Sequence, residues 1–104
     1  MAEKTGIELI AEERKRQVEK EGWTAEHDAQ HVAGELSMAA ACYAHRASLF
    51  AIKGRDYATC HRTFWPIGWP WLRESWKPKT VLKDLIRAGA LIAAEIDRLQ
   101  RMEK

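Results

Sequence analysis

The chain has 104 residues, enough for one domain with a single modest core. Hydrophobic residues make up 46% and charged residues 31% of it, which is typical of a folded globular protein and excludes a disordered one. Seventeen basic and fifteen acidic residues give a net charge of +2. These charges are intermixed, without the basic block of a nucleic-acid tail, so we expect no nucleic-acid partner.

No apolar run approaches the roughly 20 residues that span a bilayer. The N-terminal residues lack the uninterrupted apolar region of a signal peptide. Two cysteines, Cys42 and Cys60, are too few for a disulfide framework, and Cys42 is expected to be a small buried side chain. We therefore expect a cytoplasmic protein without a membrane segment, in the host cell if a phage encodes it.

A first helix is predicted over about residues 5–21. Thr5 can cap it, with Glu8 three residues later as in a capping box, and Gly22 follows its end. Its apolar residues are few, so this helix is expected to cover the edge of a core.

A second helix is predicted from about residue 25 or 29 to residue 53. Thr24 is the expected N-cap, and Gly54 marks the end. Residues 36–52 are small or apolar on almost every side of a helix, which is typical of a central helix.

A third helix is predicted over about residues 80–102, with Thr80 as its N-cap. Gly89 falls on its apolar stripe, where a missing side chain lets a neighbouring helix approach. The stripe has helical spacing and consists of Leu82, Leu85, Ile86, Ile92, Ile96 and Leu99. No strand pattern is visible, so residues 1–104 are predicted to form one all-α domain of three main helices.

Residues 54–79 form a long loop between the second and third helices, rich in Trp and Pro. Loops of this length in compact domains are usually functional when ordered. One interpretation is a lid whose tryptophans complete a small core. The other, compatible with the first, is a stacking platform for a nucleobase, with cations that reach its phosphates. The expected binding residues are Trp65, Trp69, Trp71, Arg62 and Lys77.

The stretch GWTAEHDAQHVAGEL places His27, His31 and Glu35 at i, i+4 and i+8 of the predicted helix, with Asp28 beside them. Successive turns would put them on one face, an arrangement that suits a divalent metal. The alternative is that the histidines are helix-start residues with local partners. On the third helix, Asp84 lies in the first turns, nearest the tryptophan loop.

Several segments, in order, resemble a group of small phage and prophage proteins of largely uncharacterised function. The segments are ERKRQVEKEGW, EHDAQHVAGELSMAAACYA, WPW, WKPK and DLIRAGALIAAEIDRL, and they cover residues 13–99. More distantly, the layout resembles the MazG-like all-α nucleoside triphosphate pyrophosphatases. That resemblance implies acids on adjacent helices that bind Mg²⁺, attack of water on the α–β phosphate linkage, and assembly into dimers or tetramers.

Carried over to this chain, the resemblance implies that Glu35 and Asp84 are catalytic acids. The pattern departs from the family where Met38 and Arg87 stand in place of the second acids of the two motifs. The implied Mg²⁺ ligands are therefore drawn from a wider set: Glu35, Asp84, Glu12, Glu13, Asp28, His27 and His31. The sequence leaves two hypotheses, a homodimeric Mg²⁺-dependent nucleotide pyrophosphohydrolase or a non-catalytic protein whose aromatic loop binds a host protein or a nucleotide.

Overall fold

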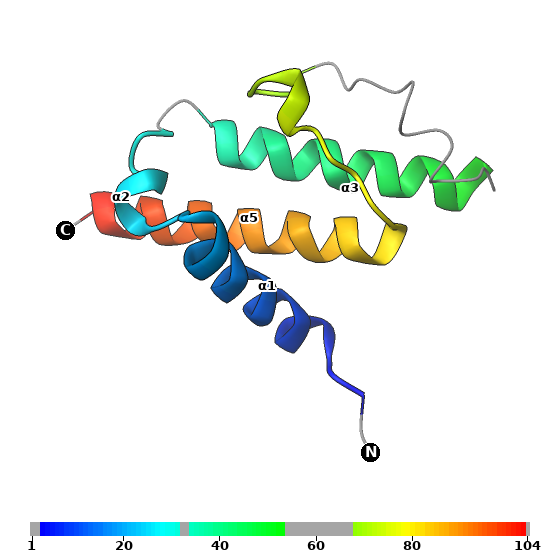
Figure 1. Cartoon of the computed structure of the whole chain (residues 1–104), viewed down its shortest axis with the longest axis horizontal. Coiled ribbons are helices and arrows are strands. Elements are labelled where there is room, and N and C mark those ends of the chain that lie inside the picture. The colour runs from blue at the N-terminus through cyan, green and yellow to red at the C-terminus, as the bar shows by residue number, and fades with distance from the viewer. Residues whose placement is uncertain (1–2, 32–33, 54–67, 104) are drawn as a thin grey trace.

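The computed structural model describes residues 3–31, 34–53 and 68–103 of the chain. These ranges contain the helices α1 (Gly6–Glu21), α2 (Ala25–Asp28), α3 (Glu35–Lys53) and α5 (Val81–Met102) (Figure 1). A short 3-10 turn, η1 (Arg73–Ser75), precedes α5, and no strand occurs in the described ranges. The prediction of an all-α protein with three main helices is confirmed, and tryptophans cluster in the segment before α5.

The helix starts are those that the capping residues predict. Thr5 and Glu8 form a complete capping box, in which each side chain accepts a hydrogen bond from the other's backbone N–H. The hydroxyl of Thr24 caps α2, and that of Thr80 caps α5. Gly22 ends α1 with φ of 72°, the left-handed conformation that glycine adopts without steric cost.

The predicted helix over residues 25–53 is interrupted. Its first part is the single turn α2, and α3 begins only at Glu35. Gly34, immediately before α3, has φ of 86°, which a continuing right-handed helix does not contain. His27, His31 and Glu35 therefore do not lie on one continuous helix. Gly54, the predicted stop of the second helix, is outside the described residues.

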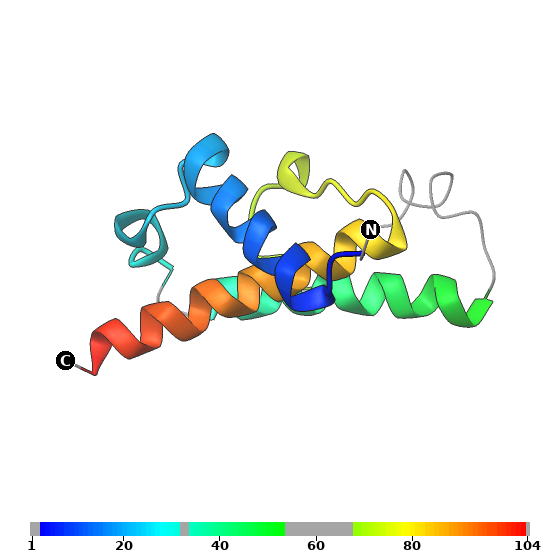
Figure 2. The ribbon, with the colours of Figure 1, turned by 90° about the horizontal axis from the view of Figure 1, so that it is seen from below.

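Helices α3 and α5 pack along each other and run in opposite directions (Figure 1). α1, α2 and the segment that carries η1 all lie over the same side of this pair (Figure 2). α1 crosses α5 where Gly89 leaves room for it, since a Cβ atom on Gly89 would lie 2.5 Å from Cδ1 of Ile10. The predicted close approach at Gly89 is confirmed.

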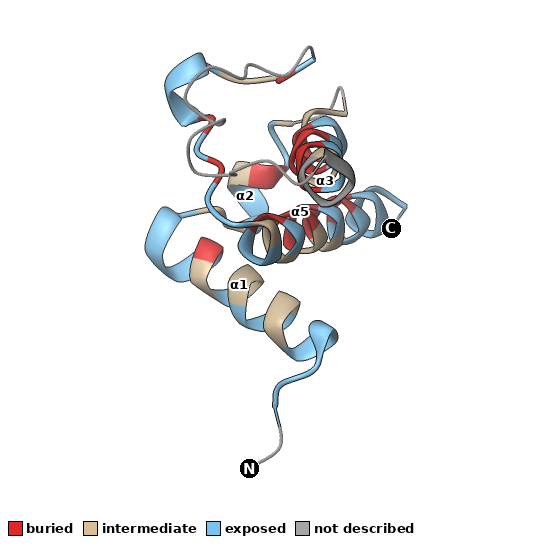
Figure 3. Ribbon diagram, turned by 90° about the vertical axis from the view of Figure 1, so that its right-hand side faces the viewer, coloured by how far each residue is buried: buried red, intermediate tan, exposed pale blue. Residues whose placement is uncertain are grey.

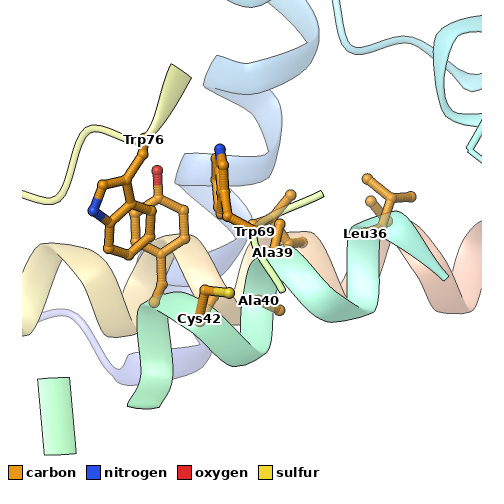
Figure 4. Packing of buried hydrophobic residues seen from close by; sticks show 10 residues of the cluster. Leu36, Ala39, Ala40, Cys42, Trp69 and Trp76 are labelled. Carbon is orange, nitrogen blue, oxygen red and sulfur yellow. The ribbon is translucent and has the colours of Figure 1, made fainter. Parts of the chain in front are cut away.

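The core lies between α3 and α5, whose facing sides carry most of the buried residues, while α1 is largely exposed (Figure 3). Small side chains, including Ala39, Ala40 and Cys42 of α3, let the two backbones approach. Trp69 and Trp76 stand over this face of α3 and extend the core (Figure 4). The interpretation of the loop as a lid that completes a small core therefore holds for these two tryptophans.

The apolar stripe of α5 is not the side that faces α3. Leu82, Leu85, Ile92, Ile96 and Leu99 are between 45% and 62% exposed. The buried side of α5 instead carries three alanines, one leucine and three charged residues. The residues of that side are Asp84, Ala88, Ala90, Leu91, Ala94, Glu95 and Arg98.

Candidate functional site: an aromatic and basic groove

A groove runs between α1 and the segment 68–79, over α3 and α5. Its first part, here called the aromatic cavity, has a volume of about 440 Å³. Four aromatic side chains and four cations line it, a combination that suits a ligand with a flat ring and negative charge. The aromatic residues are Trp23, Tyr43, Trp69 and Trp71, and the cations are Arg16, Lys77, Lys79 and Arg87.

Trp69 fixes the fold of the segment that forms one wall. Its indole N–H donates hydrogen bonds to the carbonyl oxygen of Leu72, at 3.1 Å, and to the hydroxyl of Ser75, at 3.3 Å. The rings of Trp69 and Trp76 lie 5.5 and 4.8 Å from the ring of Tyr43, measured between centroids. Because these three side chains are buried, they act as the rigid base of the cavity.

Trp71 and Trp23 are only half-buried, so they offer ring surface to a ligand. Their centroids lie 6.1 Å apart with 59° between the ring planes. Trp23 follows the left-handed Gly22, and its backbone N–H donates to the carbonyl oxygen of Gln17 at 3.0 Å, which turns the chain back over the end of α1. The cavity thus combines one tryptophan from the segment before α5 with one from the α1–α2 connection.

Two residues of α5 hold the segment 77–79 in place. The backbone N–H of Lys79 donates to both carboxylate oxygens of Asp84, at 2.9 and 3.2 Å. Arg87 Nη1 donates to the carbonyl oxygen of Lys77 and to the hydroxyl of Tyr43, each at 3.0 Å. Burial raises the pKa of Tyr43, although the nearby Arg87 acts in the opposite direction. The side chains of Lys77 and Lys79 are therefore presented from an anchored backbone.

The groove continues into a second part, here called the charged cavity, with a volume of about 400 Å³. It shares Arg16, Lys79 and Arg87 with the aromatic cavity. Lys83 of α5 and two acids of α1, Glu12 and Glu13, complete its charged lining.

Glu13 is tied to the arginine beside it. Its two carboxylate oxygens accept hydrogen bonds from Nε and Nη2 of Arg16, both at 2.8 Å, and one also accepts from Gln17 at 3.3 Å. Burial by itself would raise the pKa of Glu13, but the hydrogen bonds and charge of Arg16, with the charge of Arg87, leave this pKa below its usual value. Glu13 is thus an ionised partner of Arg16.

The histidines and acids of the α2 end form a cluster that adjoins the aromatic cavity. His27 stacks on Trp23, and His31 lies against Trp71, with ring centroids 6.1 and 5.3 Å apart. Asp28 is fully buried and makes a salt bridge with Arg14 of α1. His27 Nδ1 lies 3.5 Å from the other oxygen of Asp28, and His31 Nδ1 lies 3.7 Å from Glu35. The histidine rings stay in contact, with centroids 4.9 Å apart, despite the break in the helix.

In the single chain, Glu35 of α3 lies near the C-terminal part of α5, whereas Asp84 lies in the first turn of α5. The pKa of Arg98 is raised chiefly because this residue donates hydrogen bonds to Glu95, and the charge of Glu35 adds to the effect, which places Glu35 near Arg98. Asp84 is fourteen positions earlier in the same helix, a rise of about 21 Å at ~1.5 Å per residue. The pairing of Glu95 with Arg98 is an ordinary ion pair within one helix, at 2.6 Å.

The acids proposed as Mg²⁺ ligands do not fit one site in a single chain. Mg²⁺ needs several oxygens that converge with near-octahedral geometry. Here Glu13, Asp28 and Asp84 each serve a cation or a backbone N–H, in three different places. Among the described residues, no three His, Cys, Asp or Glu side chains are grouped so that they could hold a metal ion.

The groove contains some of the residues expected from the sequence and several that were not. Trp71 and Lys77 line it, Trp69 supports it, and Trp65 and Arg62 are outside the described residues. Sequence reasoning missed several other lining residues, and an available signal was the four-residue spacing of the three cations that precede or lie in the first turns of α5. The missed residues include Glu21, Trp23, Tyr43, Lys79, Lys83 and Arg87.

Protein-family models, curated proteins and solved structures give no match to this chain. Within the described ranges, no helix is both long enough and apolar enough to cross a membrane.

Proposed function

We propose that the protein binds a nucleotide in the groove. The base would lie against Trp71 and Trp23, and the phosphates would point toward Arg16, Lys79 and Arg87. One observation carries the proposal: half-buried indole rings and cations from three separate segments line the same cavity of about 440 Å³. Ligand pockets commonly have volumes of about 300–1,000 Å³, and stacking on aromatic rings tolerates any base.

Binding, and not hydrolysis, is what this arrangement supports best. The MazG-like reaction requires acids that gather around Mg²⁺, and in one chain these acids are separated and paired. Hydrolysis to a nucleoside monophosphate and pyrophosphate stays a prediction from the resemblance. It can be checked directly, by assaying pyrophosphate release from mixed nucleoside triphosphates with Mg²⁺.

The test is a calorimetric titration with each common ribo- and deoxyribonucleotide. Replacement of Trp71 by Ala should weaken binding about fivefold or more, since base stacking is worth about 1–3 kcal/mol. Trp71→Phe should retain most of the affinity because it keeps an aromatic face. Leu72→Ala is the matched control, since Leu72 is the exposed neighbour of Trp71 and does not line the aromatic cavity.

Failure of every nucleotide to bind at millimolar concentration would overturn the proposal. That result would favour the other hypothesis from the sequence, in which the aromatic segment contacts a host protein. Equal affinities of the wild type and Trp71→Ala would also contradict the proposed place of the base.

A further inference from the structure

The charged cavity has more positive charge available to a ligand than its lining first suggests. It contains four cations and two acids, and the acids are already engaged. Glu13 binds Arg16 through both carboxylate oxygens, and Glu12 forms an ion pair with Lys4. Neither acid therefore neutralises the lysines of the cavity.

Lys79 and Lys83 are the cations that remain. Both side chains are exposed, and in the described part of the chain neither takes part in an ion pair that the structure records. Arg87 differs, because its guanidinium group donates to Tyr43 and to the carbonyl oxygen of Lys77. An anionic ligand would therefore find two ammonium groups that take part in no recorded ion pair among the described residues.

The cations Lys79, Lys83 and Arg87 are arranged along the groove from one cavity to the other. Lys83 and Arg87 are four residues apart on α5, about one helical turn or a rise of ~6 Å, and Lys79 lies just before the N-cap Thr80. Lys79 borders both cavities, whereas Lys83 borders only the charged cavity. The lysines thus lead from the aromatic cavity into the charged one.

We infer that the charged cavity takes the outer phosphates of a nucleotide with two or three phosphates, and that Lys79 and Lys83 neutralise them without Mg²⁺. This inference rests on the proposed nucleotide binding. A lysine ammonium group binds phosphate as a compact point charge and needs no fixed geometry. Mg²⁺ at nucleotide sites is usually bound by one or two carboxylates together with the phosphates. Here the lining acid Glu13 is held by Arg16 through both carboxylate oxygens.

The experiment measures the affinities of the mono-, di- and triphosphates of one nucleoside in buffer with EDTA. The triphosphate should bind about tenfold more tightly than the monophosphate, since each partly exposed ion pair is worth up to about fivefold in affinity. Inorganic tripolyphosphate should compete with the triphosphate. Higher ionic strength should reduce the difference between mono- and triphosphate, because salt screens exposed charges.

The variant Lys83→Ala distinguishes the contribution of the charged cavity to binding from that of the aromatic cavity. It should weaken binding of the triphosphate about fivefold and leave the monophosphate within about twofold. Lys15→Ala is the matched control, because Lys15 is an exposed lysine of α1 that lines neither cavity. Circular dichroism of each variant would show that the fold is intact.

Equal affinities for mono- and triphosphate, or an unchanged triphosphate affinity in Lys83→Ala, would overturn the inference and leave the nucleotide site in place. A strict requirement for Mg²⁺ would overturn the role of the lysines as the neutralising charges. Absence of binding by all three nucleotides would remove the proposed function itself, so the two failures are distinguishable.

Discussion

The α2 end and the groove both contain charged and aromatic side chains but use their charges differently. At the α2 end, Asp28 is fully buried against Arg14, and the histidines lie beside carboxylates at 3.5 and 3.7 Å. In the groove, Lys79 and Lys83 face open space with no ion pair recorded among the described residues. Charges that satisfy one another stabilise the fold, whereas unpaired charges at a cavity are free for a ligand.

The largest expected effect comes from Asp28. Asp28→Ala removes the partner of Arg14 inside the molecule and should lower the free energy of unfolding by about 3 kcal/mol, measured by urea denaturation. Glu26→Ala is the control, since Glu26 is an exposed acid of the same turn. A loss below about 1 kcal/mol would mean that this end of the molecule is not held together by its charges.

A second change tests whether the α1 wall of the groove depends on the crossing with α5. Gly89→Leu places a side chain where Cβ alone would lie 2.5 Å from Ile10, so the free energy of unfolding should fall by about 2 kcal/mol. The double variant with Ile10→Ala should recover part of this loss. An undiminished loss in the double variant would contradict direct steric contact as the cause.

The third test uses pH to probe Glu13, an acid of the charged cavity that is paired with Arg16. The pKa of Glu13 is lowered in the folded state, so Glu13 contributes stability above its unfolded-state value of 4.5, and this stability is lost as pH falls through the lower folded-state pKa. Glu13→Gln should cost about 1 kcal/mol or less at pH 7. Denaturation between pH 7 and 3 should show the difference shrinking toward acid, and a constant difference would contradict the ionised pair.

The smallest expected effect belongs to the groove. Lys83→Ala should change the free energy of unfolding by no more than about 0.5 kcal/mol, because the side chain is exposed and the Lys83 N–H that bonds Thr80 is kept. Thermal and urea denaturation would both measure this. A clear loss of stability would show that Lys83 has an internal partner and would remove the contrast between the two regions.

The helix ends could be predicted from the sequence because their causes are local. Thr5, Thr24 and Thr80 cap helices through residues three positions away, and Gly22 acts through its own backbone conformation. The break before α3 could not, since Gly34 is compatible with several conformations and its left-handed one is not visible in the local sequence. For the same reason, the apolar stripe of α5 was visible in the sequence as a local pattern, whereas the side of α5 that faces α3 could not be identified from the sequence.

The candidate site was only partly predictable for a related reason. Trp71 and Lys77 belong to a segment whose composition is unusual, and composition is visible without a fold. Arg16, Trp23 and Arg87 come from different helices and connections, and each is unremarkable in its local sequence. Only the crossing of α1 over α5, made possible at Gly89, brings them to one cavity.

The chain of ring contacts has a practical consequence for spectroscopy. Trp23 contacts Trp71, Trp71 contacts Trp69, and Trp69 contacts Trp76, with centroids between 4.9 and 6.1 Å apart. At such separations, excitation energy passes readily from one indole to the next, so the four residues emit as a coupled group. A ligand that contacts only the outermost ring, Trp23, would then quench the fluorescence that is excited in the buried Trp69 and Trp76.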